Sequence, residues 1–151
     1  MALYMTGEYV LPVPRAAVWL ALNDPKLLQQ CIPGCESLEQ ISETEFAVVA
    51  RLAVGPVKAR FKGKVRLQDL DPPQGYTIVG EGDGGIAGFA KGNVAVVLAD
   101  TDGSTKLNYR SQAQIGGKLA QLGQRLVAGT AKKIADLLFA NLAAALSPKQ
   151  E

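Results

Sequence analysis

The side chains able to perform acid–base or nucleophilic chemistry are limited first by the absence of histidine from the 151-residue chain. Without histidine, the chain cannot form Ser-His or Cys-His nucleophile pairs, histidine metal sites or histidine acid–base groups. The candidates that remain near the predicted interior are Glu81, Asp83, Tyr76, Tyr109 and Ser111. Because no two of them have a spacing that indicates a catalytic pair, we predict a protein that is not an enzyme.

The two cysteines, Cys31 and Cys35, are four residues apart across a Pro-Gly turn. Two thiols without histidine or further cysteines do not complete a zinc site, and disulfides are uncommon in the cytosol. We interpret both as ordinary buried thiols and predict no metal and no resident cofactor.

Residues 80–88 contain five glycines, Gly80, Gly82, Gly84, Gly85 and Gly88. A phosphate-binding loop would end in Gly-Lys-Ser/Thr and begin a helix, and this segment does neither. We interpret it as a bent strand followed by a wide turn. Ile86 and Phe89 would lie beside that turn, as a lip to any space inside the fold.

Five cations alternate along residues 57–67 with apolar or small residues, and they are Lys58, Arg60, Lys62, Lys64 and Arg66. This period of two predicts one strand with a basic face and an inward face. The basic face could meet anionic lipid headgroups or an acidic protein. It could equally be a solvated surface, partly neutralised by Glu81 and Asp83. Nucleic acid is not predicted, because the net charge is only +2 and no aromatic residue shares the strand face of these cations.

The elements that would position these residues are one strand, two short helices, six strands and a long helix. They are predicted at residues 3–11 (strand), 15–22 and 25–31 (helices), 35–41, 44–54, 57–67, 76–85, 90–99 and 105–115 (strands), and 116–146 (helix). Apart from the first crossover every connection is short, which predicts antiparallel pairing. The fold class is therefore α+β, a curved seven-stranded antiparallel sheet wrapped around a long C-terminal helix.

The long helix is predicted from apolar residues that recur every three or four positions, which places them on one stripe. They are Leu119, Leu122, Leu126, Ile134, Leu137, Leu138, Leu142 and Leu146. A helix of roughly 40–45 Å needs a broad surface against which to bury that stripe. We expect one domain over 1–146 and a disordered tail over 147–151. No stretch reaches the ~18 apolar residues of a membrane span, and no targeting segment begins the chain, so a cytoplasmic protein is predicted.

Small residues collect on the sheet face turned toward the helix, notably Gly80, Gly82, Gly84 and Gly92. In a filled core, small residues on one wall require large ones opposite. Alternatively the space is open for an apolar ligand. A third interpretation is that the glycines relieve strain where the sheet bends.

Several motifs, taken in order, resemble the CoxG family of carbon monoxide dehydrogenase subunits, which is part of the START-like, helix-grip superfamily. They are residues 18–19 (VW), 23–25 (NDP), 31–38 (CIPGCESL), 54–58 (VGPVK), 61–65 (FKGKV), 88–92 (GFAKG) and 116–123 (GGKLAQLG). The resemblance implies a cavity between sheet and helix, with a quinone or other isoprenoid lipid as ligand. It also implies a molybdenum hydroxylase, such as carbon monoxide dehydrogenase, as partner.

We therefore predict a non-enzymatic carrier with an apolar cavity. Its expected lining is Phe61, Tyr76, Ile78, Phe89, Tyr109, Leu119, Leu122, Leu126 and Ile134. The alternatives are an assembly or membrane-recruitment factor acting through its surface, or a cyclase or hydrolase of the superfamily. Family members often continue into an extension associated with membrane attachment, and this sequence stops at Glu151. Either that extension is missing from this sequence, or contact with the inner membrane face is peripheral and transient, through the lip or the basic strand.

Overall fold

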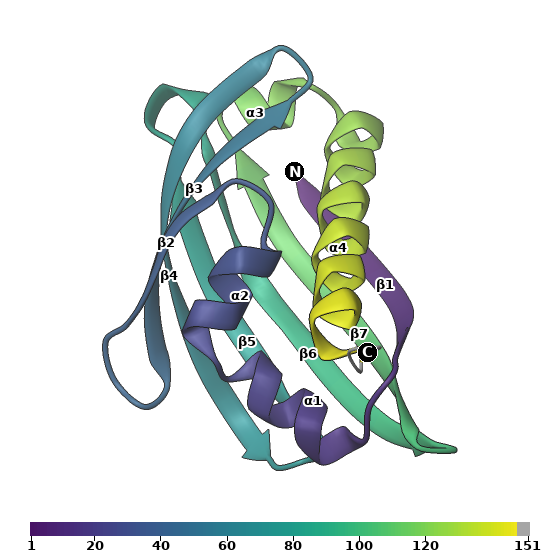
Figure 1. Ribbon diagram of the computed structural model, residues 1–151. Helices are drawn as coiled ribbons and strands as arrows, with labels where there is room; N and C mark the ends of the chain where they lie inside the picture. The colour runs from purple at the N-terminus through teal and green to yellow at the C-terminus, as the bar shows by residue number, and fades with distance from the viewer. Residues whose placement is uncertain (148–151) are drawn as a thin grey trace.

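The computed structural model describes residues 1–147 and consists of one sheet with helices on one side of it (Figure 1). The strands are β1 (Ala2–Leu11), β2 (Cys35–Gln40), β3 (Glu45–Val54), β4 (Val57–Asp71), β5 (Gly75–Asp83), β6 (Phe89–Thr101) and β7 (Ser104–Gly116). All pairs are antiparallel, in the order β1-β7-β6-β5-β4-β3-β2. The sheet curves around a long C-terminal helix, which confirms the predicted helix-grip fold.

The two short helices, α1 (Arg15–Leu22) and α2 (Pro25–Cys31), have the bounds predicted from the sequence. The Asp24 carboxylate caps α2 by accepting hydrogen bonds from the N–H groups of Lys26 and Leu27. Proline at the first position costs no hydrogen bond, because that N–H has no partner within a helix. These local signals explain why the prediction is accurate here.

The C-terminal helix begins later than predicted. A short helix, α3 (Lys118–Gln121), is followed by a break and then by α4 (Gln124–Leu146). Gly123 has φ +89, a left-handed conformation that no regular helix contains. The prediction of one continuous helix over 116–146 is therefore wrong at its start, where Gly116 still belongs to β7.

Strand β4 follows the predicted alternation, with its inward residues at least half-buried and its cations exposed up to Arg66. It and β6 are longer than predicted. Conversely, the predicted strand 76–85 ends at Asp83, and the wide turn after it contains a single 3-10 turn, η1 (Gly85–Ala87).

The buried side chains form two separate clusters along α4. The lower cluster, under α1, α2 and the C-terminal half of α4, contains Leu11, Val18, Ala21, Leu22, Cys31, Phe46, Leu67, Tyr76, Val96, Leu98, Leu107 and Leu142. The upper cluster, near α3 and the start of α4, contains Leu3, Val54, Ile115, Leu119 and Val127. The core is thus divided rather than continuous.

Of the predicted tail, only Ser147 is among the described residues. Its hydroxyl donates a hydrogen bond to the Ala143 carbonyl at 2.8 Å, immediately after α4 ends. The remaining positions, 148–151, lie outside the described residues. None of the described helices is both long and apolar enough to cross a membrane.

Candidate functional site

A belt of small residues crosses the inner face of the sheet between the two clusters. Its members are Gly7 of β1, Gly63 of β4, Gly80 and Gly82 of β5, Gly92 of β6 and Ser111 of β7. The strand register pairs Gly63 with Gly82 and Gly80 with Gly92, so the glycines are direct neighbours. On β1, β4, β6 and β7 the inward residues on either side of the belt belong to one cluster or the other, and on β5 Ile78 belongs to the lower cluster. The division of the core therefore has a direct cause in the sequence.

At two of these glycines a side chain would fit without a clash. A Cβ built at Gly82 would have only the Lys62 carbonyl oxygen nearby, at 4.0 Å. One at Gly80 would meet β4 atoms at 3.5 and 3.6 Å, which is ordinary contact, and no atom of α4 within 4 Å. At Gly92, by contrast, the Cβ would lie 2.1 Å from the Gln112 carbonyl oxygen, so close backbone approach explains that glycine. Room thus remains above Gly80 and Gly82 on the side that faces α4.

The opposite wall of this space is the middle of α4. Val127 and Leu142 are buried in the upper and lower clusters and anchor the two ends of the helix. Ile134 lies between them, is only half-buried and packs in neither cluster. An apolar side chain in that position would contact a hydrophobic molecule held over the belt.

Most of the predicted lining residues lie on the inner side. Phe61, Leu119 and Leu122 belong to the upper cluster, and Tyr76, Ile78 and Tyr109 to the lower. The Phe61 ring lies over Gly84, where a Cβ would be 2.5 Å from it. Tyr76 is buried and meets Trp19 edge-on at 5.3 Å, and burial raises the pKa of its hydroxyl. The belt is thus bounded by aromatic rings on both sides.

Two predicted lining residues are elsewhere. Phe89 alternates with the inward residues of β6, is 43% exposed, and its ring lies over Gly116 on the outer face. Leu126 is 40% exposed and contacts the β3–β4 turn at Gly55. Phe89 lies on the same outer strand face as Lys91. Leu126 lies in the first turn of α4, after the break at Gly123, and its side chain is turned toward the β3–β4 turn. Neither side chain therefore points into the space over the belt.

Sequence reasoning missed a polar group at the seam between β1 and α4. The Tyr9 hydroxyl donates a hydrogen bond to Asp136 Oδ1 at 2.7 Å, and Lys132 Nζ donates to Oδ2, also at 2.7 Å. The Tyr9 ring is stacked against Phe139 and Tyr109, with centroids at 4.4 and 6.1 Å. The only part of this group that the sequence indicates is the Lys132–Asp136 pair, because residues four apart on a helix lie side by side. Tyr9 is 127 positions from its partner.

The electrostatics of this group are consistent with its contacts. Lys132, and then Tyr9, lower the pKa of the Asp136 carboxyl by hydrogen bonding. Burial, followed by the bond to Asp136, raises the pKa of the Tyr9 hydroxyl. The carboxylate is therefore kept ionised and the phenol protonated. This arrangement fastens α4 to the edge strand.

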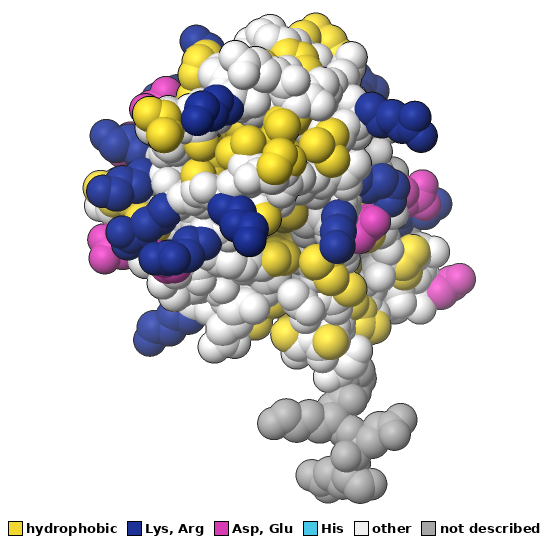
Figure 2. All heavy atoms as spheres, turned by 90° about the horizontal axis from the view of Figure 1, so that it is seen from above, with side chains coloured by type: hydrophobic (Ala, Val, Ile, Leu, Met, Phe, Trp, Pro, Cys, Tyr) yellow, Lys and Arg dark blue, Asp and Glu magenta, His cyan; other side chains and the backbone are white. Residues whose placement is uncertain are grey.

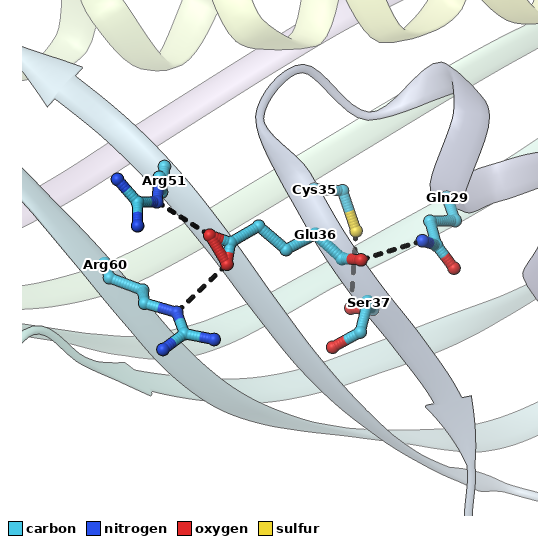
Figure 3. A network of polar contacts seen from close by, with 6 residues as sticks. All are labelled: Gln29, Cys35, Glu36, Ser37, Arg51 and Arg60. Carbon is cyan, nitrogen blue, oxygen red and sulfur yellow. Dashed lines mark hydrogen bonds and ion pairs between the residues drawn. The ribbon is translucent and has the colours of Figure 1, made fainter.

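The basic residues lie on the outer face of the sheet, as predicted, but the carboxylate that pairs with them differs from the prediction. Glu36 of β2 accepts hydrogen bonds from Arg51 Nε at 2.7 Å and Arg60 Nε at 3.0 Å (Figure 3). The Arg51 bond, as the largest cause, lowers the pKa of this carboxyl. The partners expected from the sequence, Glu81 and Asp83, lie opposite Lys64 and Lys62 in register.

Four of the predicted cations form no ion pair within 4.0 Å with any residue of the described range 1–147. They are Lys58, Lys62, Lys64 and Arg66. Three hollows open on this outer face, of about 630, 560 and 430 Å³. Lys64, Arg66 and Lys91 border the largest, together with Tyr4 and Ile41. Sequence reasoning did not predict them, because the twist of a sheet has no local sequence signal.

The thiols are reduced, and Cys31 is buried at 3% exposure, so burial raises its pKa. Cys35 is only half-buried, and its Sγ lies 3.4 Å from the Ser37 carbonyl oxygen (Figure 3). The prediction of a buried thiol is thus confirmed for Cys31 and only partly for Cys35. Within the described part of the chain, no three His, Cys, Asp or Glu side chains gather as metal ligands.

Comparison with known proteins identifies the family to which the chain belongs. The family model for CoxG, described as a carbon monoxide dehydrogenase subunit, matches residues 7–147. None of the curated proteins compared with the chain matches it.

Solved structures share the fold. A conserved protein from Geobacillus kaustophilus is 32% identical with a TM-score of 0.89, and the match covers 94% of this chain and 93% of that one. A protein from Chromobacterium violaceum is 16% identical with a TM-score of 0.71, covering 97% and 99%. An aromatase/cyclase (Zhui) from Streptomyces sp. R1128 is 11% identical with a TM-score of 0.69, covering 95% and 93%. At such low identity the last two are evidence of fold alone.

Proposed function

This chain belongs to the CoxG family of carbon monoxide dehydrogenase subunits, and we propose that it is a non-enzymatic carrier of a hydrophobic molecule. The cargo would lie between the sheet and α4, over the belt that divides the core. The observation that carries this proposal is that Gly80 and Gly82, on the face toward α4, leave room that larger side chains would occupy in a filled core. Residual space of this kind costs stability, and binding a cargo there would offset that cost.

The chemistry of the walls favours an apolar cargo with one weakly polar end. Each CH₂ group removed from water contributes ~0.8 kcal/mol, so a chain of several such groups binds without any charged contact. Ser111 adds a hydroxyl to the belt, and its Oγ lies 3.4 Å from the Met5 carbonyl oxygen. That hydroxyl could instead bond a carbonyl of the cargo. A quinone or other isoprenoid lipid has both features.

The partner we propose is a molybdenum hydroxylase of the carbon monoxide dehydrogenase type. Support for this step comes from the family description alone. The carrier would exchange a quinone with that enzyme, whose electrons need an acceptor.

Native mass spectrometry of protein purified from its own host, followed by organic extraction, tests the cargo. We expect a quinone or prenyl lipid at about one molecule per chain. Protein that is empty, and that stays empty after incubation with quinones in detergent, would contradict the carrier.

A second function, docking to the enzyme through the outer face, is favoured by the exposed cations without ion pairs. Triple reversal of Lys58, Lys62 and Lys64 to glutamate tests it in a pull-down with the hydroxylase. Arg60 is left unchanged, because it also holds Glu36 and edge strand β2. If docking is the function, the triple variant loses the enzyme and keeps its cargo. Retained capture would contradict docking through this face.

A further inference from the structure

The sheet has two edge strands, and they differ in how they are protected. In the strand order, β1 lies at one edge and β2 at the other (Figure 1). An edge strand presents main-chain N–H and C=O groups that can pair with another chain, and most proteins guard such a strand. The usual guards are a short strand, a bulge, a proline, a lysine or an element that covers the edge. Only one of the two edges of this sheet is guarded in these ways.

Strand β2 is the guarded edge. It has six residues, and its pairing with β3 contains a register shift between Cys35 and Ser37. Helix α2 lies against it, and the Gln29 side chain donates a hydrogen bond to the Glu36 carbonyl oxygen at 2.9 Å (Figure 3). Cys35 Sγ lies 3.4 Å from the Ser37 carbonyl oxygen. Side chains of the same molecule therefore already occupy part of the β2 main chain.

Strand β1 has none of these guards. Its ten residues pair with β7 without a register shift and include no proline, lysine or arginine. Met1 and Ile115 exchange two hydrogen bonds, of 2.8 and 2.9 Å, so the odd-numbered residues point their main-chain groups at β7. The even-numbered residues of β1 point theirs away from the sheet. Within residues 1–147 the structure gives these outward groups no hydrogen bond.

The even-numbered side chains of β1 lie on the outer face of the sheet, and two of them are exposed apolar groups. Tyr4 is 70% exposed and Val10 60%. The charged residue of this strand, Glu8, is paired with Lys106 at 3.2 Å. Lys and Arg side chains are most crowded on the left in Figure 2, the side where Figure 1 places β3 and β4. A second chain that approached β1 would therefore meet apolar side chains and little unpaired charge.

We propose that two copies of the chain join through β1, side by side and antiparallel, so that their two sheets become one. A second copy fits this edge because β1 is complementary to itself. Outward main-chain groups occur at even positions, so even residues must face even residues across a two-fold axis. An axis at Gly7 places Tyr4 opposite Val10 of the second copy and Thr6 opposite its Glu8. About eight main-chain hydrogen bonds then form, two at each of four facing pairs.

Gly7 is a favourable centre for this pairing. At such a position of an antiparallel ladder the two Cα atoms are only ~4.5 Å apart, and a glycine adds no side chain there. The register also pairs the two exposed apolar side chains, an aromatic one with a β-branched one, which is a favourable combination across strands. Glu8 stays beside its own Lys106 and faces a threonine rather than a second carboxylate. In the joined sheet, both α4 helices lie on the same side.

Sedimentation velocity of the purified chain over a wide range of concentrations tests the pairing. We expect a species with twice the chain mass of 15.9 kDa. Thr6→Pro removes an outward N–H and no bond to β7, so it should weaken the pair about tenfold or more while the fold persists. The matched control is Gln40→Pro on β2, whose N–H also points outward, since the next residue, Ile41, donates to Glu45. It should leave the pair intact.

A second pair of variants changes side chains and leaves the main chain undisturbed. Val10→Lys should also weaken the pair about tenfold or more, because a lysine on an edge strand opposes pairing. Val97→Lys makes the same change on the central strand β6, at a side chain that is 56% exposed, and should have no effect. Amide hydrogen exchange locates the contact. The N–H groups of Thr6 and Glu8 should be protected in the pair and exchange freely in Val10→Lys.

Three outcomes would overturn this pairing. They are a 15.9 kDa species at every concentration, a pair that neither Thr6→Pro nor Val10→Lys weakens, and a single chain that captures extended peptides through β1 without pairing with itself. If Thr6→Pro does not fold, Val10→Lys decides the question. Quinone binding in detergent is a separate measurement, so a paired protein that binds no quinone would contradict the carrier alone.

Discussion

The two halves of the core differ in size and in the burial of their most buried side chains. The lower cluster contains Leu11, Leu107 and Leu142 at 0% exposure, covered by both short helices. The upper cluster is smaller, and its buried members, such as Leu3, Val54 and Ile115, remain 6–8% exposed. Between them lies the glycine belt. In the carrier proposal, the lower half mainly stabilises the fold, and the belt beside the upper half binds the cargo.

The largest effect is expected from Leu142→Ala in the lower cluster. Truncating a fully buried leucine leaves a cavity and costs about 2–5 kcal/mol of unfolding free energy. Leu119→Ala should cost less, because Leu119 is 5% exposed rather than 0% and packs in the smaller, upper cluster. Denaturant unfolding of both variants measures the difference. Equal losses of unfolding free energy in the two variants would contradict the proposed difference between the lower and upper clusters.

The next effect concerns the belt. Gly82→Leu should place a large side chain on the inner face, where the cargo is proposed to lie, and weaken binding of a quinone in detergent by about tenfold or more, or ~1.4 kcal/mol. Stability should change little, because no atom lies closer than 4.0 Å to the new Cβ. Ala95→Leu adds a leucine side chain on the outer face and is the control. A Gly82→Leu variant with unaltered affinity would place the cargo elsewhere.

The smallest effect is expected at the seam. Tyr9→Phe removes the hydrogen bond to Asp136, and one such bond contributes roughly 1 kcal/mol. It leaves the ring stacked on Phe139. Unfolding free energy at neutral pH measures the loss. If Tyr9→Phe also accelerates cargo release, the seam controls access to the belt; if stability is unchanged, the bond does not hold α4.

The pH dependence of the seam has a definite sign. The pKa of Asp136 is lowered in the folded state, so its contribution is present above the ordinary aspartate pKa of about 3.9 and is lost as pH falls through the lower folded value. Acid unfolding should therefore be less steep in Asp136→Asn. An identical pH profile in the variant would show that this carboxyl does not contribute.

Much of the fold could be predicted because it depends on short-range patterns. The alternation from Val57 to Leu67 reports one buried face directly, and Asp24-Pro25 marks the start of a helix. The same patterns place Phe61, Ile78 and Leu119 on the inner side. The patterns mispredicted the start of the long helix, because a glycine can lie within a helix or interrupt it. Gly123 interrupts the helix, and Gly116 belongs to β7, where it leaves room for the Phe89 ring.

What the sequence alone determined is the set of elements, their order, the basic strand face and the small residues that divide the core. Periodicity and turn residues record which face is buried over a few positions, and that information is local. Tertiary structure alone decided that Tyr9 meets Asp136 and that Glu36 joins Arg51 to Arg60. It also left β1 open at one edge of the sheet and placed α2 against the other. These groupings depend on strand register and on where α4 crosses the sheet, which many distant contacts set together.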